Sequence, residues 1–222
     1  MDSKRILVSR NLKLDSQLRV WATEQQHQLI EAPFIRIDPV LEVEIPQTDW
    51  VFFSSPNGLD VYFNNYPIMA SKIGVYGSGT LFRLEKRGMR ADFVGDTSKN
   101  PKEIGEEFFN LIKPSDTVLF PQSQLSKKSI VSLNKVNSCI EKVIYNTSLE
   151  GHELANIDVA ILTSPSNIDG FLLENKVGNT QFIVLGETSK SHFQNLGLTD
   201  KIAVPKSADE QAVILLLEQL LN

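Results

Sequence analysis

The sequence predicts an α/β protein made of two similar parallel-sheet domains, and three observations lead to this prediction. Short, continuously apolar runs alternate along the chain with segments of helical periodicity. Parallel strands that are covered by helices on both faces have such runs, and the alternation of strands with helices is typical of α/β folds. One sequence pattern also occurs twice, about half a chain length apart, and two extended stretches interrupt the alternation. A chain of 222 residues is long enough for two small domains.

Six apolar runs are predicted to be strands, and three groups of apolar residues are predicted to lie on helices. The strands are residues 6–8, 50–53, 73–76, 117–120, 159–162 and 182–185. The helical groups are Ile104, Phe108, Phe109 and Ile112; Ile130, Leu133 and Val136; and Val213, Leu216, Leu217 and Leu220. The helical spacing within each group places its members on one face of a helix.

Two stretches, residues 34–45 and 143–153, lack helical spacing. Pro39 lies inside the first stretch and Pro46 follows it. Both stretches are expected to be extended strands that link domains rather than build a core. Tyr145 lies in the second stretch, where a tyrosine can face a cleft between domains. The alternative is that Tyr145 is an ordinary strand aromatic.

The internal repeat relates residues 49–58 to residues 158–167, which lie 109 positions later. The same offset pairs Gly77 with Gly186 and Gly88 with Gly197, and also Val75 with Val184. A weaker match relates residues 6–10 and the helix after them to residues 118–121 and the helix after those. The repeat predicts that the chain is a duplication of one unit, and the alternative is a chance similarity between α/β patterns.

In both copies an apolar strand ends in two hydroxyl residues and is followed by a proline and a helix. The residues of these two helix starts are Ser55, Pro56, Asn57 and Gly58, and Ser164, Pro165, Ser166 and Asn167. Serine is a favoured helix N-cap, and proline is favoured in the first helical turn. The N–H groups and the dipole of such a helix start can bind an anion at the carboxyl edge of the sheet, where open α/β sheets bind ligands. Simple capping of the helix is the alternative.

A second pair of helix starts follows the next strand in each copy. Its residues are Gly77, Ser78, Gly79 and Thr80, and Gly186, Glu187, Thr188 and Ser189. Glycine allows the tight turn, and the hydroxyl at the fourth position can cap the helix or contact a ligand. Neither segment is a Walker A loop, because no Gly-Lys-Ser/Thr follows. Neither is a dinucleotide-binding fingerprint, because the glycines do not have the spacing of that motif.

Composition limits the remaining classes of function. The formal net charge of −5 argues against a nucleic-acid binder, although an anionic small molecule needs only a few donors. Cys139 is the single cysteine, which excludes an internal disulfide, and its apolar surroundings (residues 136–143) favour a core position over a nucleophile. The longest strongly apolar stretch, residues 212–217, is far shorter than the roughly 20 residues that span a bilayer. The chain is therefore expected to be soluble and cytoplasmic, and its histidines lack metal-ligand spacing.

Taken together, the order and spacing of these motifs resemble the uroporphyrinogen-III synthase family. The pieces that carry the resemblance are residues 6–10, 49–58, 77–80 with Gly88, 143–147, 158–167, 186–189 with Gly197, Val204-Pro205 and 207–209. No single piece is specific, whereas their combination covers nearly the whole chain.

The resemblance implies two flavodoxin-like α/β domains, a two-stranded β linker and a ligand cleft between the domains. Residues 1–33 and 157–222 would form one domain, residues 48–142 the other, and residues 34–47 and 143–156 the linker. The implied reaction cyclises hydroxymethylbilane, a linear tetrapyrrole with several carboxylates, with loss of water and inversion of the last ring. It needs no cofactor or metal, and we expect a monomer that binds neither nucleic acid nor membrane.

The resemblance also implies roles for individual residues. Tyr145 matches the family tyrosine that assists loss of the substrate hydroxyl, and a phenol with a pKa of about 10 is a neutral donor at pH 7. Arg10 is expected to pair with a substrate carboxylate. The four helix starts named above are expected to hold other carboxylates through their N–H groups, together with the hydroxyls of Ser55, Thr80, Ser164 and Ser189. Glu187 departs from this pattern, because it brings negative charge towards an anionic ligand. The alternative function is a non-catalytic two-domain module that binds a small molecule or regulates.

Overall fold

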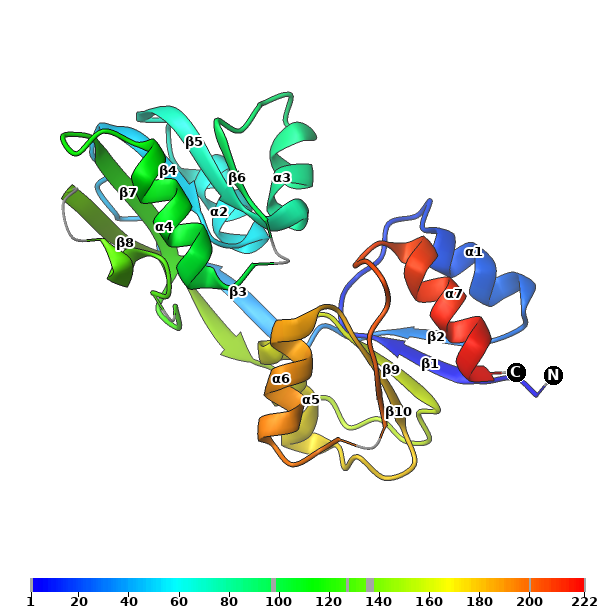
Figure 1. The fold of residues 1–222 in the computed structure, drawn as a ribbon. Coiled ribbons are helices and arrows are strands. Elements are labelled where there is room, and N and C mark those ends of the chain that lie inside the picture. Colours follow the sequence, from blue (N-terminus) through cyan, green and yellow to red (C-terminus); the bar gives the residue numbers. More distant parts are fainter. Residues whose placement is uncertain (1, 97–98, 127, 135–137, 200, 222) are drawn as a thin grey trace. The chain divides into compact units, whose positions relative to one another are not determined.

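The computed structural model describes residues 2–96, 99–126, 128–134, 138–199 and 201–221 (Figure 1). The chain divides into two compact units, which are Met1–Arg36 with Ser148–Asn222 and Ile37–Thr147. We call them unit 1 and unit 2. Unit 1 is built from both ends of the chain, whereas unit 2 is one continuous segment.

Unit 1 contains a five-stranded parallel sheet. Its strands are β1 (Arg5–Val8), β2 (Gln28–Glu31), β9 (Val159–Leu162), β10 (Gln181–Val184) and β11 (Ile202–Ala203). Its helices are α1 (Gln17–Glu24), α5 (Pro165–Glu174), α6 (Glu187–Asn195) and α7 (Glu210–Leu221). In space the strands follow the order β11-β10-β9-β1-β2, and all neighbours are parallel. Counted along the chain, this is the 2-1-3-4-5 order of flavodoxin-like sheets.

The second sheet has six strands in the order β3-β8-β7-β4-β5-β6. The strands are β3 (Ile35–Pro39), β4 (Thr48–Phe53), β5 (Ala70–Tyr76), β6 (Phe93–Gly95), β7 (Thr117–Ser123) and β8 (Ser138–Leu149). Its helices are α2 (Pro56–Asn65), α3 (Gly77–Glu85), α4 (Pro101–Leu111) and the short 3₁₀ helix η1 (Val131–Leu133). Strands β4 to β8 are joined by parallel pairs. The predicted α/β class with two parallel-rich sheets is confirmed.

The two sheets repeat one arrangement of strands and helices. Strands β4, β5 and β6 correspond to β9, β10 and β11, which lie 109 residues later. With these strands aligned, the order β8-β7-β4-β5-β6 of the second sheet has the same pattern as β2-β1-β9-β10-β11 of the first. Helices α4 and α7 also begin 109 residues apart, at Pro101 and Glu210. Gly77 and Gly186 have φ angles of 80° and 94°, and Gly88 and Gly197 both have 75°. These left-handed turns favour glycine, which explains why the repeat retains it there.

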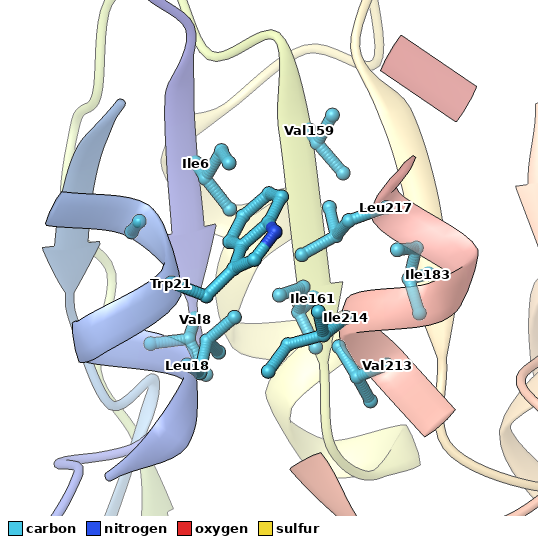
Figure 2. Packing of buried hydrophobic residues seen from close by; sticks show 11 residues of the cluster. Ile6, Val8, Leu18, Trp21, Val159, Ile161, Ile183, Val213, Ile214 and Leu217 are labelled. Atoms are coloured by element: carbon cyan, nitrogen blue, oxygen red, sulfur yellow. The ribbon is translucent and has the colours of Figure 1, made fainter. Parts of the chain in front are cut away.

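Each sheet is buried on both faces, as its continuous apolar runs predict. On one face of the first sheet, Ile6, Val8 and Ile161 pack against Trp21 of α1 and Leu217 of α7 (Figure 2). The alternate residues of the same strands pack with residues of α5 and α6 on the other face. The second sheet repeats this division, with α2 and α3 on one face and α4 with η1 on the other.

Three sequence-based expectations are wrong or incomplete. The predicted helix around Ile130 and Leu133 is only the single 3₁₀ turn η1, and Val136 lies outside the described residues. The strands β2, β6 and β11 have no predicted counterpart, because short strands near a sheet edge lack a long, doubly buried apolar run. Cys139 lies on β8 and is half-buried at the margin of the core. Burial raises the pKa of its thiol to about 11, which disfavours the reactive thiolate.

The second extended stretch builds a core, contrary to expectation. Strand β8 pairs with β7 from Ser138 to Tyr145, and Ile144 and Tyr145 belong to the buried cluster under α2. From the first stretch, Ile37 and Val43 pack against the same cluster. The sequence did not predict that these stretches pack in the core, because the first contains proline and both contain polar residues.

One solvent-exposed interaction occurs in both units at the amino ends of the strands. The Asp49 carboxylate accepts hydrogen bonds from the Thr117 N–H (2.8 Å) and hydroxyl (2.9 Å). At the equivalent place, the Asp158 carboxylate accepts from the Arg5 N–H at 2.8 Å. Each aspartate therefore ties its strand to the neighbouring central strand.

The Asp49 contact predicts a pH dependence of stability. The hydrogen bonds from the Thr117 backbone and then from its hydroxyl lower the pKa of the Asp49 carboxyl. A lowered pKa in the folded state gives stability that is present above the unfolded pKa of about 3.9 and is lost as the pH falls through the folded pKa. The free energy of unfolding is measured in urea at several pH values between 6 and 3. Asp49→Asn is expected to reduce its fall with decreasing pH. Thr117→Val, which keeps the backbone donor, should reduce it less, and curves parallel to wild type would contradict the assignment.

Candidate active site

In unit 2, two helix starts adjoin at the carboxyl edge of the sheet. Helix α2 follows β4, and Ser55 is its N-cap: the Ser55 Oγ accepts from the Gly58 N–H at 3.0 Å. Helix α3 follows β5 directly and, among the described residues, has no side-chain cap. A Cβ atom at Gly79 would lie 3.7 Å from the ring of Pro56, so the first turns of α2 and α3 are neighbours.

Tyr145 joins this edge from β8. Its hydroxyl lies 3.0 Å from the Ser55 Oγ, and its side chain is 5% exposed. Burial raises the pKa of the Tyr145 phenol, and the hydrogen bond with Ser55 opposes that shift. The phenol is therefore a neutral proton donor over the whole physiological pH range.

In unit 1, the equivalent helix start is closed by its own side chains. Ser164 caps α5 by accepting from the Asn167 N–H at 3.3 Å. The Asn167 side-chain amide donates to Ser164 (2.9 Å) and Thr163 (3.2 Å), and its oxygen accepts from the Phe34 N–H (3.0 Å). Asn167 is 3% exposed, so its side chain holds the structure together and does not face solvent. Pro165 and Ser166 lie beside it in the partly exposed first turn.

A serine that the sequence analysis did not single out completes this edge. The Ser9 Oγ accepts from the Thr163 N–H at 2.9 Å and lies 3.1 Å from the Thr163 hydroxyl. Ser9 is 2% exposed, and it joins the ends of β1 and β9. Its position directly after the apolar run of residues 6–8 could have indicated a hydroxyl at the carboxyl edge of the sheet.

The second helix start of each unit is uncapped within the described part of the chain. Neither α3 nor α6 receives a side-chain hydrogen bond there at its first turn. Ser78, Gly79, Gly186 and Thr188 are exposed, whereas Gly77 is buried. Exposed N–H groups without a partner at a helix start favour an anion. Glu187 opposes this at α6, although its carboxylate pairs with Lys190 at 3.3 Å.

The hydroxyls at the fourth position of these segments are not on the surface. Thr80 is 1% exposed and Ser189 is 2% exposed. In the part of the chain that the structure describes, the Thr80 Oγ1 is buried and has no hydrogen-bond partner. The structure therefore exposes other residues of the two first turns to a ligand, and not these two hydroxyls. Contact of Thr80 or Ser189 with a ligand stays a prediction.

Arg10 follows β1 at the carboxyl edge of unit 1 and already has an acidic neighbour. Its guanidinium lies 3.5 Å from the Glu210 carboxylate at the start of α7. Glu210 also accepts from the Ser16 hydroxyl (2.8 Å) and the Leu18 N–H (3.1 Å). Glu210 thus holds the starts of α1 and α7 together and keeps the partly exposed Arg10 nearby.

The described residues contain neither a membrane-spanning helix nor a metal-ligating cluster. No helix among residues 2–96, 99–126, 128–134, 138–199 and 201–221 has the length and apolar character to span a membrane. The same residues contain no group of three or more His, Cys, Asp or Glu side chains arranged to hold a metal ion.

Comparison with known proteins places the chain in a family. The sequence profile of the family described as Uroporphyrinogen-III synthase HemD matches residues 16–219. The chain belongs to the uroporphyrinogen-III synthase family. The match includes the repeated helix starts of both units and Tyr145, whereas Arg10 lies outside it. No curated protein sequence matches the chain.

Solved uroporphyrinogen-III synthase structures share the fold. The structure of uroporphyrinogen-III synthetase from Helicobacter pylori is 16% identical, with a TM-score of 0.66, and the alignment covers 99% of this chain and 100% of that one. A mutant uroporphyrinogen III synthase from Thermus thermophilus is 10% identical, with a TM-score of 0.62 and 98% coverage of both chains. At these identities the likeness concerns the fold, and the site roles depend on the geometry described above.

Proposed function

We propose that the chain is a uroporphyrinogen-III synthase, a lyase that cyclises hydroxymethylbilane with loss of water and inversion of the last ring. The observation that carries the proposal is the buried, neutral phenol of Tyr145, held at 3.0 Å from Ser55 at the carboxyl edge of the sheet. Family membership supplies the tetrapyrrole context.

The phenol suits the first chemical step. The substrate hydroxyl leaves as water when it receives one proton, and the pyrrole that carried it becomes a protonated azafulvene. Tyr145 supplies that proton or a strong hydrogen bond to the leaving oxygen. In the inverted route the substituted carbon of the last ring first attacks the azafulvene carbon. The old bond from that substituted carbon to its methylene bridge then breaks, which gives a second protonated azafulvene. The free α-carbon of the last ring closes the macrocycle onto this second azafulvene and loses its proton, which restores the phenol. The proton balance is zero apart from the water that leaves.

Backbone N–H groups suit the substrate carboxylates. The uncapped starts of α3 and α6 present such groups at the carboxyl edges of the two sheets. Arg10 adds one cation when it leaves Glu210 or shares its charge with it. A chain with a formal net charge of −5 can bind a polycarboxylate in this way, because local dipoles rather than a basic patch hold the anion. We further propose that the enzyme acts as a cytoplasmic monomer without a cofactor.

The isomer assay tests the function. Freshly prepared hydroxymethylbilane closes without inversion in the absence of an enzyme, so each reaction is oxidised and its type I and type III porphyrins are separated. With the protein we expect the type III isomer to predominate, and with heat-denatured protein we expect type I alone. A type I product in both samples would reject the proposal.

The pairing of Arg10 with Glu210 and the burial of the Thr80 and Ser189 hydroxyls favour a second candidate. In it, the chain is a non-catalytic module that binds or senses a small molecule. Thermal unfolding with uroporphyrin, sugars and amino acids distinguishes the two. Stabilisation by sugars or amino acids and not by uroporphyrin supports the module, whereas stabilisation by uroporphyrin alone supports the synthase.

A further inference from the structure

The two copies of the repeated helix start use their capping serine differently. In both, the serine Oγ accepts the N–H of the residue three positions later, which is Gly58 in unit 2 and Asn167 in unit 1. These two residues occupy the same place in the repeat. In unit 1 the Asn167 side chain donates a second hydrogen bond to its serine, so the site is filled by its own helix. In unit 2 glycine has no side chain, and the serine is left available for another partner.

Tyr145 takes the place that Gly58 leaves open. A Cβ atom at Gly58 would lie 3.2 Å from the Ser55 Oγ, 3.3 Å from the Pro121 carbonyl oxygen and 3.6 Å from the Tyr145 ring. The absence of a side chain at this position therefore lets the tyrosine ring pack against the helix start. Its hydroxyl then reaches the serine oxygen at 3.0 Å.

An irregularity in β8 aims the tyrosine at this place. Gln122 pairs with Val143, but the next residue, Ser123, pairs with Tyr145, so Ile144 is an extra residue in the strand. Successive side chains of a regular strand point to opposite faces, whereas a bulge changes that alternation. Ile144 and Tyr145 accordingly both belong to the same buried cluster, at 0% and 5% exposure.

The hydrogen bonds around Ser55 limit the roles of its hydroxyl group. A serine hydroxyl has one proton and two lone pairs, and one lone pair of Ser55 accepts the Gly58 N–H. Among the residues that the structure describes, Ser55 is the hydrogen-bond partner of the Tyr145 hydroxyl. If the Ser55 proton points to the tyrosine oxygen, the phenol proton remains available for another acceptor.

We propose that Ser55 is the positioning residue of Tyr145: it donates its proton to the phenol oxygen and so directs the phenol proton towards the substrate. Gly58 and the bulge at Ile144 make this contact possible. The inference rests on the proposed function for its catalytic part, whereas the contact itself is testable without substrate. In unit 1 the equivalent serine is occupied by Asn167 instead of a phenol.

The first experiment measures the tyrosine directly. 3-Fluorotyrosine is incorporated at position 145, and its ¹⁹F resonance is titrated in the free protein. A donor to the phenol oxygen stabilises the phenolate, so Ser55→Ala is expected to raise the pKa of residue 145. Ser55→Thr, which keeps the hydroxyl, should return it towards wild type. Ser164→Ala removes the same type of cap in unit 1 and is the control for a general loss of stability; it should leave the resonance unchanged. An unchanged or lowered pKa in Ser55→Ala overturns the proposal.

The second experiment links the contact to turnover. Gly58→Asn introduces the side chain that unit 1 has, and it is expected to displace Tyr145 and reduce kcat at least 10-fold. Ser55→Ala is expected to reduce kcat with a smaller change in KM, and Ser55→Thr to recover most of the loss. Normal kcat in a folded Ser55→Ala protein removes the positioning role. If wild type makes no type III isomer while the ¹⁹F titration behaves as expected, the proposed function fails and the hydrogen-bond assignment stands.

Discussion

Replacement of Tyr145 by phenylalanine is expected to reduce kcat for the type III isomer by about 100-fold or more, with little change in fold. General acid catalysis typically contributes 10²- to 10⁴-fold, and phenylalanine removes only the hydroxyl that would supply it. The ring of Tyr145 packs in the buried cluster under α2, and phenylalanine retains that packing. Steady-state kinetics of the type III product, with circular dichroism of the same sample, measure both parts of the prediction.

Tyr66→Phe is the matched control for Tyr145→Phe. Tyr66 lies in the same unit, packs against the same cluster and donates its hydroxyl to the Val40 carbonyl. Each variant loses one tyrosine hydrogen bond, which changes the free energy of unfolding by about 0.5–1.5 kcal/mol. Only Tyr145→Phe should lose activity. Equal loss in both variants would point to stability as the cause, and wild-type activity in Tyr145→Phe would remove the tyrosine from the reaction.

Gly170→Ala is expected to destabilise unit 1 by about 3 kcal/mol, the upper end of the usual effect of overpacking. Gly170 lies within α5, where alanine would otherwise favour the helix by about 1 kcal/mol. Its added Cβ, however, would lie 2.3 Å from the Phe34 carbonyl oxygen and 2.7 Å from the Phe34 Cβ. The Phe34 backbone cannot easily move away, because its N–H donates to Asn167 and its carbonyl accepts from Glu150.

Urea unfolding followed by Trp21 fluorescence measures this effect, since Trp21 lies in the core of unit 1. A Trp50→Phe background removes the signal of the other tryptophan. Gly79→Ala is the control in unit 2, where Trp50 fluorescence in a Trp21→Phe background follows unfolding. Gly79 is also a helix glycine, but among the described residues its added Cβ would meet only the Pro56 ring, at 3.7 Å. This substitution should leave stability unchanged or raise it by up to about 1 kcal/mol. Similar effects of the two substitutions would contradict the close-contact explanation.

The sequence was informative where burial or backbone geometry restricts residue choice. Doubly buried strands such as residues 159–162 must be apolar throughout, and turns with positive φ, such as those at Gly77 and Gly186, favour glycine. Strands near the sheet edges and the bulge at Ile144 lack such a restriction, so hydrophobic pattern alone did not reveal them. The sequence pattern singled out Tyr145 as a candidate on a linking strand, and the resemblance gave it a role. Its contact with Ser55 could not be anticipated, because the two residues are 90 positions apart.

In the candidate site, too, the sequence predicted local features and did not predict contacts between distant residues. Pro56 and Pro165 occupy the first helical turn, and Ser55 and Ser164 cap their helices as their order in the chain indicates. The sequence did not indicate that the Asn167 side chain is fully engaged in internal hydrogen bonds. The local sequence around a buried asparagine can be the same as that around a ligand-binding one. That distinction depends on which residues from distant strands supply the partners.

The discontinuous construction of unit 1 also bears on how the chain folds as it leaves the ribosome. Strands β1 and β2 are complete by Glu31, but their partner β9 begins only at Val159. At a synthesis rate of about 5–20 residues per second, these strands wait about 6–26 seconds for β9 to be made. Unit 2 is contiguous and is made entirely within that interval, so it can fold first. Nascent unit 1 is thus the half whose strand edges stay unpaired for longest while the chain is being made.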